Sequence, residues 1–185
     1  MWIIIAAAGL ILAYIIFTYN GFASLRNRAR GAWADIDVQL KMRHDLVPNL
    51  VATVQGYAQH EKGVLEDVAR LRSKAQELNG IGDIGGNEAQ LSTAIKTLFA
   101  VAESYPQLRA DAGFRDLQKQ LTEIEEHIQY ARRYYNAVVR DLNTKCDTFP
   151  SGIIGSWFGY RHLEYFQAAD DDREAVKFNM GGQGQ

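Results

Sequence analysis

The chain has 185 residues, with 20 basic against 22 acidic side chains and a formal net charge of −2. This balance excludes the basic surplus of a typical nucleic-acid-binding protein and the acidic surplus of a disordered tail, so we expect no nucleic-acid partner. The single cysteine, Cys146, excludes an internal disulfide.

The chain begins with an uncharged apolar run. Residues 2–17 read WIIIAAAGLILAYIIF, close to the ~20 apolar residues that a helix needs to cross the hydrocarbon core of a bilayer. We interpret residues 1–20 as a transmembrane anchor whose partner is the lipid bilayer. The side chains expected to meet lipid are Trp2, Ile3, Ile4, Leu10, Ile11, Leu12, Ile15, Ile16 and Phe17.

Basic residues flank this run on its C-terminal side. Arg26, Arg28 and Arg30 follow it, and no Lys or Arg precedes it. Basic residues near a span stay on the cytoplasmic side, which predicts a single-pass protein with its N-terminus outside and the rest in the cytoplasm. A cleaved secretory signal is the alternative, but its basic n-region is missing and Gly21-Phe22-Ala23 is a weak cleavage site.

After the anchor, apolar residues recur at helical spacing and strand-like alternation is absent. We predict four amphipathic helices, at residues 24–58, 62–79, 88–104 and 111–147. The first is expected to continue from the anchor, broken at most around Asn20-Gly21. Its apolar pattern is interrupted by Arg43 and His44, and Pro48 is expected to bend it.

The segments between these helices are rich in glycine. A turn is expected between Gly56 and Gly63, and a loop over residues 79–86, which hold four glycines in eight residues.

The last predicted helix has the clearest pattern. From Phe114 to Leu142 its apolar residues alternate at intervals of three and four, the spacing of a coiled-coil seam. It is expected to begin near Asp111 and to stop by Phe149-Pro150. Helices joined by short connections pack antiparallel, so the predicted fold is all-α: a transmembrane helix followed by an antiparallel four-helix bundle over residues 21–148.

Residues 149–185 form a C-terminal extension of different character, ending in a glycine-rich tail, Gly181–Gln185, that is expected to be flexible. An aromatic cluster outside a bundle either packs on it as a cap or meets the membrane or a neighbouring subunit. We predict contact with the bilayer or another subunit. The candidate contact residues in this extension are Trp157, Phe158, Tyr160, Tyr165 and Phe166.

A second binding candidate lies on the last predicted helix. Tyr135 belongs to the apolar seam, and Arg132 and Tyr134, which precede it, are expected to point elsewhere. They are available for polar contacts with a partner, or they belong to an ordinary solvated face.

Catalytic and metal-binding patterns are weak. His60-Glu61 begins like HExxH, but residue 64 is valine. Glu123 and His127 share a helix face without a second matching pair on another helix, and Cys146 has no identifiable base nearby. We therefore expect no metal, no cofactor and no enzymatic activity.

Several strings are specific enough to suggest a family. They are AWADIDVQLK (32–41), RHDLVPNLV (43–51), ESYP (103–106), ARRYYN (131–136) and FPS (149–151). Together with Tyr19-Asn20 and Leu25-Arg26-Asn27, they make the chain resemble the LemA family.

The resemblance implies an N-terminal membrane anchor and an antiparallel four-helix bundle, and it carries over no catalytic residues. A family member of the magnetosome membrane suggests a role in membrane organisation, and members are often encoded beside membrane-bound zinc metalloproteases. We therefore expect a scaffold that homo-oligomerises at the bacterial inner membrane. The alternative is an accessory subunit of a membrane metalloprotease.

Overall fold

The computed structural model describes residues 1–166, and within that range it is all-helical, with no strand. The predicted flexible tail, Gly181–Gln185, lies outside the described residues. Six helices follow one another: α1 (Trp2–Tyr57), α2 (Lys62–Ala75), α3 (Ile81–Ala102), α4 (Pro106–Ala110), α5 (Ala112–Asp147) and α6 (Ser151–Trp157).

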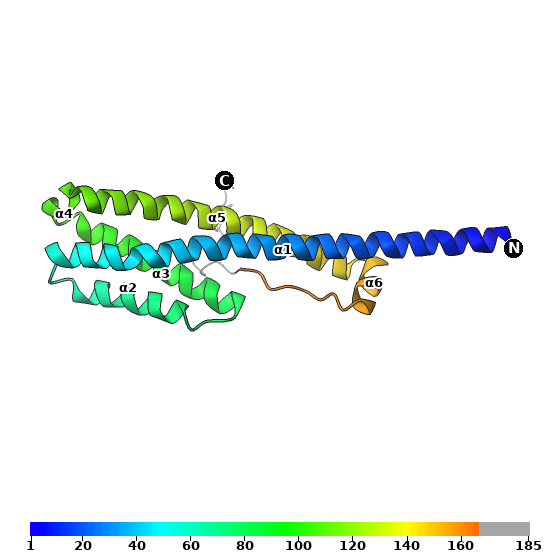
Figure 1. Cartoon of the computed structure of the whole chain (residues 1–185). Coiled ribbons are helices and arrows are strands. Elements are labelled where there is room, and N and C mark those ends of the chain that lie inside the picture. Colours follow the sequence, from blue (N-terminus) through cyan, green and yellow to red (C-terminus); the bar gives the residue numbers. More distant parts are fainter. Residues whose placement is uncertain (167–185) are drawn as a thin grey trace, which may run out of the picture.

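α1 dominates the shape of the molecule. It is a single helix of 56 residues, about 84 Å long at 1.5 Å per residue. Figure 1 shows its N-terminal part extending beyond all other elements, while its C-terminal part lies among α2, α3 and α5. The helix continues through Asn20-Gly21 without a break, and Pro48 lies inside it. The apolar run and the body of the protein therefore share one continuous helix.

The predicted boundaries of α5 are confirmed. The Asp111 carboxylate accepts a 2.8 Å hydrogen bond from the backbone N–H of Phe114 and so caps the first turn. The helix ends at Asp147, two residues before Phe149-Pro150. The turn after Tyr57 is also where the glycines predicted it, since α1 ends there and α2 begins at Lys62.

The loop predicted over residues 79–86 is wrong, because α3 begins at Ile81 rather than at residue 88. Ile81 and Ile84 pack against a buried apolar cluster, and the Asn87 side chain donates a 3.0 Å hydrogen bond to the carbonyl of Leu71. These tertiary contacts outweigh the cost of about 1 kcal/mol that each helical glycine carries. α2 is shorter than predicted and ends at Ala75, and the short helices α4 and α6 were not predicted.

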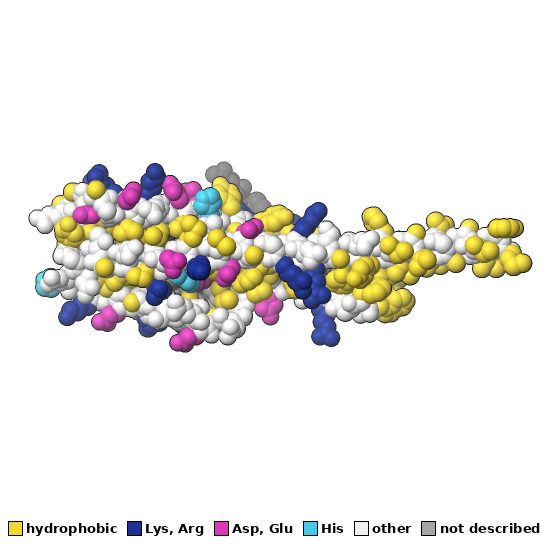
Figure 2. Space-filling view, viewed as in Figure 1, with side chains coloured by type: hydrophobic (Ala, Val, Ile, Leu, Met, Phe, Trp, Pro, Cys, Tyr) yellow, Lys and Arg dark blue, Asp and Glu magenta, His cyan; other side chains and the backbone are white. Residues whose placement is uncertain are grey.

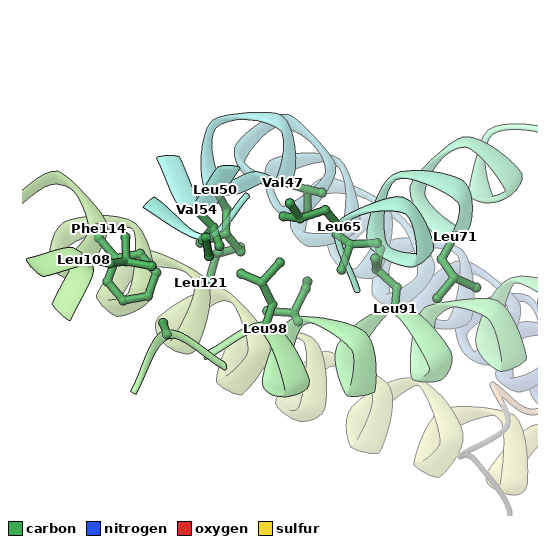
Figure 3. Close-up of a cluster of buried hydrophobic side chains, with 14 residues drawn as sticks. Val47, Leu50, Val54, Leu65, Leu71, Leu91, Leu98, Leu108, Phe114 and Leu121 are labelled. Atoms are coloured by element: carbon green, nitrogen blue, oxygen red, sulfur yellow. The ribbon is translucent and has the colours of Figure 1, made fainter. Parts of the chain in front are cut away.

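The buried apolar side chains form two clusters. The first, here called the distal core, gathers apolar residues from α1 to α5 (Figure 3). It lies at the end of the molecule far from the N-terminus (Figure 1). It includes Val47, Leu50, Val54, Leu65, Val68, Leu71, Leu91, Leu98, Leu108, Phe114 and Leu121.

The second cluster, here called the proximal core, lies nearer the N-terminus. It is built from α1 and α5 together with Phe166, which follows α6 in the chain. Its buried members are Ala32, Ile36, Leu40, Ile124, Ile128, Tyr135, Val139 and Phe166.

Candidate membrane-facing site and buried charge cluster

The apolar run of α1 is exposed along its whole length. Trp2 is 85 % and Phe17 is 78 % exposed, and Ile15 is the one residue of the run with intermediate burial. Within residues 1–166, α1 is the helix long and apolar enough to cross a bilayer. Exposed large side chains without any polar stripe are typical of a lipid-facing helix rather than of a core helix.

Basic side chains gather where this apolar helix meets the body. Arg26, Arg28 and Arg30 are all exposed, and the Arg26 guanidinium lies 5.9 Å from the centre of the Tyr160 ring. Figure 2 shows Lys and Arg side chains clustered at this junction, beside an apolar patch at the base of the extended helix. The surface of α1 thus changes from apolar to basic within a short length of the helix.

An aromatic group, here called the basal aromatic cluster, joins α1 to the segment around α6. The Tyr19 and Phe158 rings are 4.9 Å apart edge to face, and the Phe22 and Tyr160 rings stack at 4.8 Å. Phe22 is fully buried. A Cβ on Gly155 would come within 2.7 Å of the Phe22 ring, so only glycine permits α6 to approach α1 this closely.

The segment after α6, residues 158–166, begins with a turn at Phe158-Gly159 and then runs along α5 without regular secondary structure, and we call it the strap. The Asn143 side chain donates to the carbonyl of Leu163 at 3.0 Å and accepts from its N–H at 2.9 Å. Asn136 pairs with Phe166 in the same two-way manner, at 3.1 and 2.9 Å.

The spacing of these pairs explains the register of the strap. Seven helical residues rise about 10.5 Å, and three extended residues span about 10 Å. Two asparagines seven apart on α5 therefore match Leu163 and Phe166, three apart on the strap. The Tyr135 hydroxyl donates a 2.9 Å hydrogen bond to the carbonyl of Glu164. Burial raises the pKa of Tyr135.

The candidate contact residues fall into two groups. Phe166 is buried, and Tyr160 is half-buried against Phe22, so both face the chain itself. Trp157 is 72 % and Phe158 is 50 % exposed, and Tyr165 is also exposed. Phe166 belongs to the proximal core, so the strap covers part of the apolar faces of α1 and α5, while Trp157, Phe158 and Tyr165 remain exposed.

Arg132 and Tyr134 are two residues apart on α5, so their side chains point in different directions. The Arg132 guanidinium lies 5.3 Å from the centre of the Phe166 ring, on the strap side. Tyr134 is exposed. Of this pair, Tyr134 is the side chain presented to solvent.

A buried charge cluster lies where the two cores meet. Arg43 is 1 % exposed and forms ion pairs with Glu88 of α3 and, at 2.6 Å, with Glu125 of α5. His44 Nε2 lies 2.8 Å from the second carboxylate oxygen of Glu88. Burial alone would raise the pKa of Glu88, but the hydrogen bond with His44 and the charge of Arg43 outweigh it and hold that pKa below its ordinary value.

Sequence reasoning missed this cluster. It treated Arg43 as an interruption of the apolar pattern on α1, yet Arg43 occupies a core position, between buried Leu40 and Val47. The spacing of three and four around it was the available signal. Nothing local in the sequence pointed to Glu88, because the residues before it were predicted to form a loop.

Metal-ligand geometry is absent from the described part of the chain, which holds no group of three or more His, Cys, Asp or Glu side chains placed to share an ion. Burial raises the pKa of the Cys146 thiol, which disfavours the reactive thiolate.

Comparison with known proteins agrees with the strings noted in the sequence. The LemA family profile matches residues 32–179. Magnetosome protein MamQ 2 and magnetosome protein MamQ 1 of Paramagnetospirillum magneticum are each 24 % identical over 182 aligned positions, covering 84 % of this chain and 67 % of the relative. Magnetosome protein MamQ of Magnetospirillum gryphiswaldense is 20 % identical, covering 82 % of this chain and 65 % of its own length. The chain therefore spans about two thirds of the length of these relatives.

Proposed function

Because the chain belongs to the LemA family, whose profile covers most of its length, we propose that it is a membrane-anchored helical scaffold without catalytic activity of its own. It is held in the bacterial inner membrane by the apolar part of α1, and it organises other membrane or envelope components through the helical body. The magnetosome proteins among its relatives support a membrane-associated role.

One observation carries the proposal: the exposed apolar run and the core-forming part of α1 are one helix. Residues 2–17 are uncovered, and the same helix supplies Ile36, Leu40, Val47 and Leu50 to the two cores. A continuous helix transmits position and orientation rigidly, whereas a flexible linker does not. A body fixed in this way to its anchor suits a scaffold.

The proposed topology is single-pass, with the N-terminus outside and the body in the cytoplasm. It rests on the exposed arginines at positions 26, 28 and 30 and on the retention of basic residues on the cytoplasmic side of a span. The test replaces Gln185 with cysteine in a Cys146→Ser background. The thiol should resist an impermeant reagent in intact spheroplasts and react once the membrane is opened; labelling in intact spheroplasts would refute this topology.

We further propose that α1, α2, α3 and α5 act as an antiparallel four-helix bundle and that copies of it associate at the membrane. The distal core unites residues of all four helices. Tyr130 and Tyr134, four residues apart on α5, are exposed on one face, and tyrosine is enriched at protein interfaces.

Size in mild detergent tests the scaffold. A large symmetric assembly of this chain alone is expected. Isolation instead as a small complex with a membrane-bound zinc metalloprotease would contradict self-association and support the role of an accessory subunit. Tyr134→Ser with Tyr130→Ser should reduce the size of the assembly without changing helical content, and Lys119→Ser, on the same helix and also exposed, is the matched control.

A further inference from the structure

α6 has two faces of opposite environment. Ser151, Ile154 and Gly155 are buried against the chain, while Ile153 and Trp157, four residues apart, are exposed on the other side. Phe149, just before the helix, and Phe158, just after it, are exposed as well. Ile153 and Trp157 therefore point outward from α6, with Phe149 and Phe158 exposed at its two ends, and we call these four side chains the α6 face.

The α6 face lies level with the end of the apolar run. Phe158 contacts Tyr19, which is two residues beyond Phe17 on α1. Figure 2 shows this apolar patch adjoining the base of the extended apolar helix. The apolar surface of α1 and that of α6 are thus continuous.

The exposed arginines set the other limit. Arg26 is seven residues beyond Tyr19, about 10 Å along the axis of α1. The aromatic side chains thus lie between the end of the apolar run of α1 and Arg26, the first basic residue after it. This is the depth of the headgroup region, where Trp and Tyr are enriched and where basic side chains reach towards phosphates.

We propose that the α6 face inserts into the headgroup region of the same bilayer that α1 crosses and forms a second lipid contact. The inference rests on the proposed anchor. One helix leaves rotation about its own axis free, whereas a second contact displaced from that axis fixes which side of the body faces the membrane.

A bilayer suits this surface better than a second copy of the chain. Three aromatic side chains at 150–250 Å² each and one isoleucine, all partly covered, offer on the order of 500 Å², below the ~800 Å² per partner of a stable protein interface. An amphipathic helix that lies in the plane of the membrane interface buries its apolar face at the boundary between headgroups and acyl chains.

The three tryptophans, Trp2, Trp33 and Trp157, allow a direct test in the full-length protein. It is reconstituted into phosphatidylcholine and phosphatidylglycerol vesicles whose acyl chains carry bromine, a fluorescence quencher, near the headgroup or deeper. The contribution of Trp157 is the difference between the wild type and Trp157→Phe, and that of Trp2 is the difference from Trp2→Phe. Both side chains are exposed, so neither substitution disturbs packing.

We expect the Trp157 emission to be blue-shifted and to lose most of its intensity with bromine near the headgroup, less with bromine placed deeper. Trp33, isolated in the Trp2→Phe, Trp157→Phe double variant, packs on Tyr135 and Phe166 and should be unaffected by either lipid. It is the internal control for quenching that does not require insertion.

Two results would overturn the inference while leaving the anchor intact, as shown by quenching of Trp2. If aqueous iodide quenches the Trp157 fluorescence and brominated lipid does not, the α6 face lies in water. If neither iodide nor brominated lipid quenches the Trp157 fluorescence, protein covers this side chain, such as a second copy of the chain. Absence of lipid quenching at Trp2 would instead refute the anchor, and the α6 inference with it.

Discussion

The distal and proximal cores solve the same problem by different means. The distal core joins residues of the helices α1 to α5, and apolar side chains fill it. At the proximal core α1 and α5 are covered in part by the strap, an extended segment whose backbone groups need partners. Asn136 and Asn143 provide them. Where helices are available apolar burial suffices, and where an extended segment replaces a helix, side-chain hydrogen bonds must satisfy its backbone.

The charge cluster marks the boundary between the two cores on three helices. Arg43 lies between Leu40 and Val47, and Glu88 lies between Ile84 and Leu91. Glu125 follows Ile124 of the proximal core on α5. A buried polar layer at one level has the geometry that fixes helix register.

The largest effect is expected at this boundary. Arg43→Ala leaves Glu88 buried without its cation, which should lower the free energy of unfolding by about 3–5 kcal/mol. Denaturant unfolding of the full-length protein in mild detergent measures it. The Arg43→Met, Glu88→Met double variant should recover most of the loss because the buried carboxylate is removed together with its cation, while Glu125, which loses Arg43 in both variants, is partly exposed. Wild-type stability in Arg43→Ala would contradict a buried ion pair at this position.

Cavity-forming changes compare the two cores directly. Leu121→Ala in the distal core should cost about 2–5 kcal/mol. Ile128→Ala in the proximal core should fall in the lower part of that range, because the strap can move inwards to fill the space, whereas four packed helices cannot. Melting temperatures of both variants test this; an unchanged value for Leu121→Ala would show that its helix face is not buried.

The strap should loosen when one asparagine is removed. Asn143→Ala deletes both hydrogen bonds to Leu163, and we expect a local cost of about 1–3 kcal/mol. It is measured as faster hydrogen exchange at the Leu163 amide, with little change in the distal core. Asn143→Asp keeps the acceptor for that N–H and should exchange at an intermediate rate. Equal protection in all three proteins would contradict the two-way pairing.

Acid should weaken the boundary through Glu88. Its pKa is lower in the folded state than in the unfolded chain, where a glutamate titrates near ~4.3, so the unfolded state binds more protons between the two values. This contribution to stability is fully present above the unfolded pKa and is lost as pH falls through the folded pKa. Melting temperature followed from pH 7 downwards should fall less steeply in Glu88→Gln. Parallel curves would refute the linkage.

The smallest effect on folding is expected at the α6 face. Trp157→Ser together with Phe149→Ser removes mainly exposed surface and should change the free energy of unfolding by less than about 0.5 kcal/mol. Phe166→Ser, on the same segment but buried, is the matched control and should be strongly destabilising. Unfolding by the double change would identify the α6 face as a structural cap.

The sequence alone predicted the features that local rules control. The apolar run, the apolar seam of α5, the start of that helix near Asp111 and the turn after Tyr57 all follow from residues close together in the chain. Hydrophobic periodicity and capping act over one or a few helical turns, so no distant residue is needed to recognise them.

Tertiary structure decided what depends on distant partners. Residues 81–86 are helical because Ile81 and Ile84 pack against the proximal core, although the glycines of this segment predicted a loop. Arg43 is buried because Glu88, 45 residues away, neutralises it. The strap takes its path because two asparagines seven apart on α5 match two residues three apart on an extended chain. In each case a contact between segments far apart in sequence stabilises the local structure. The residue pattern along the chain does not reveal such a contact.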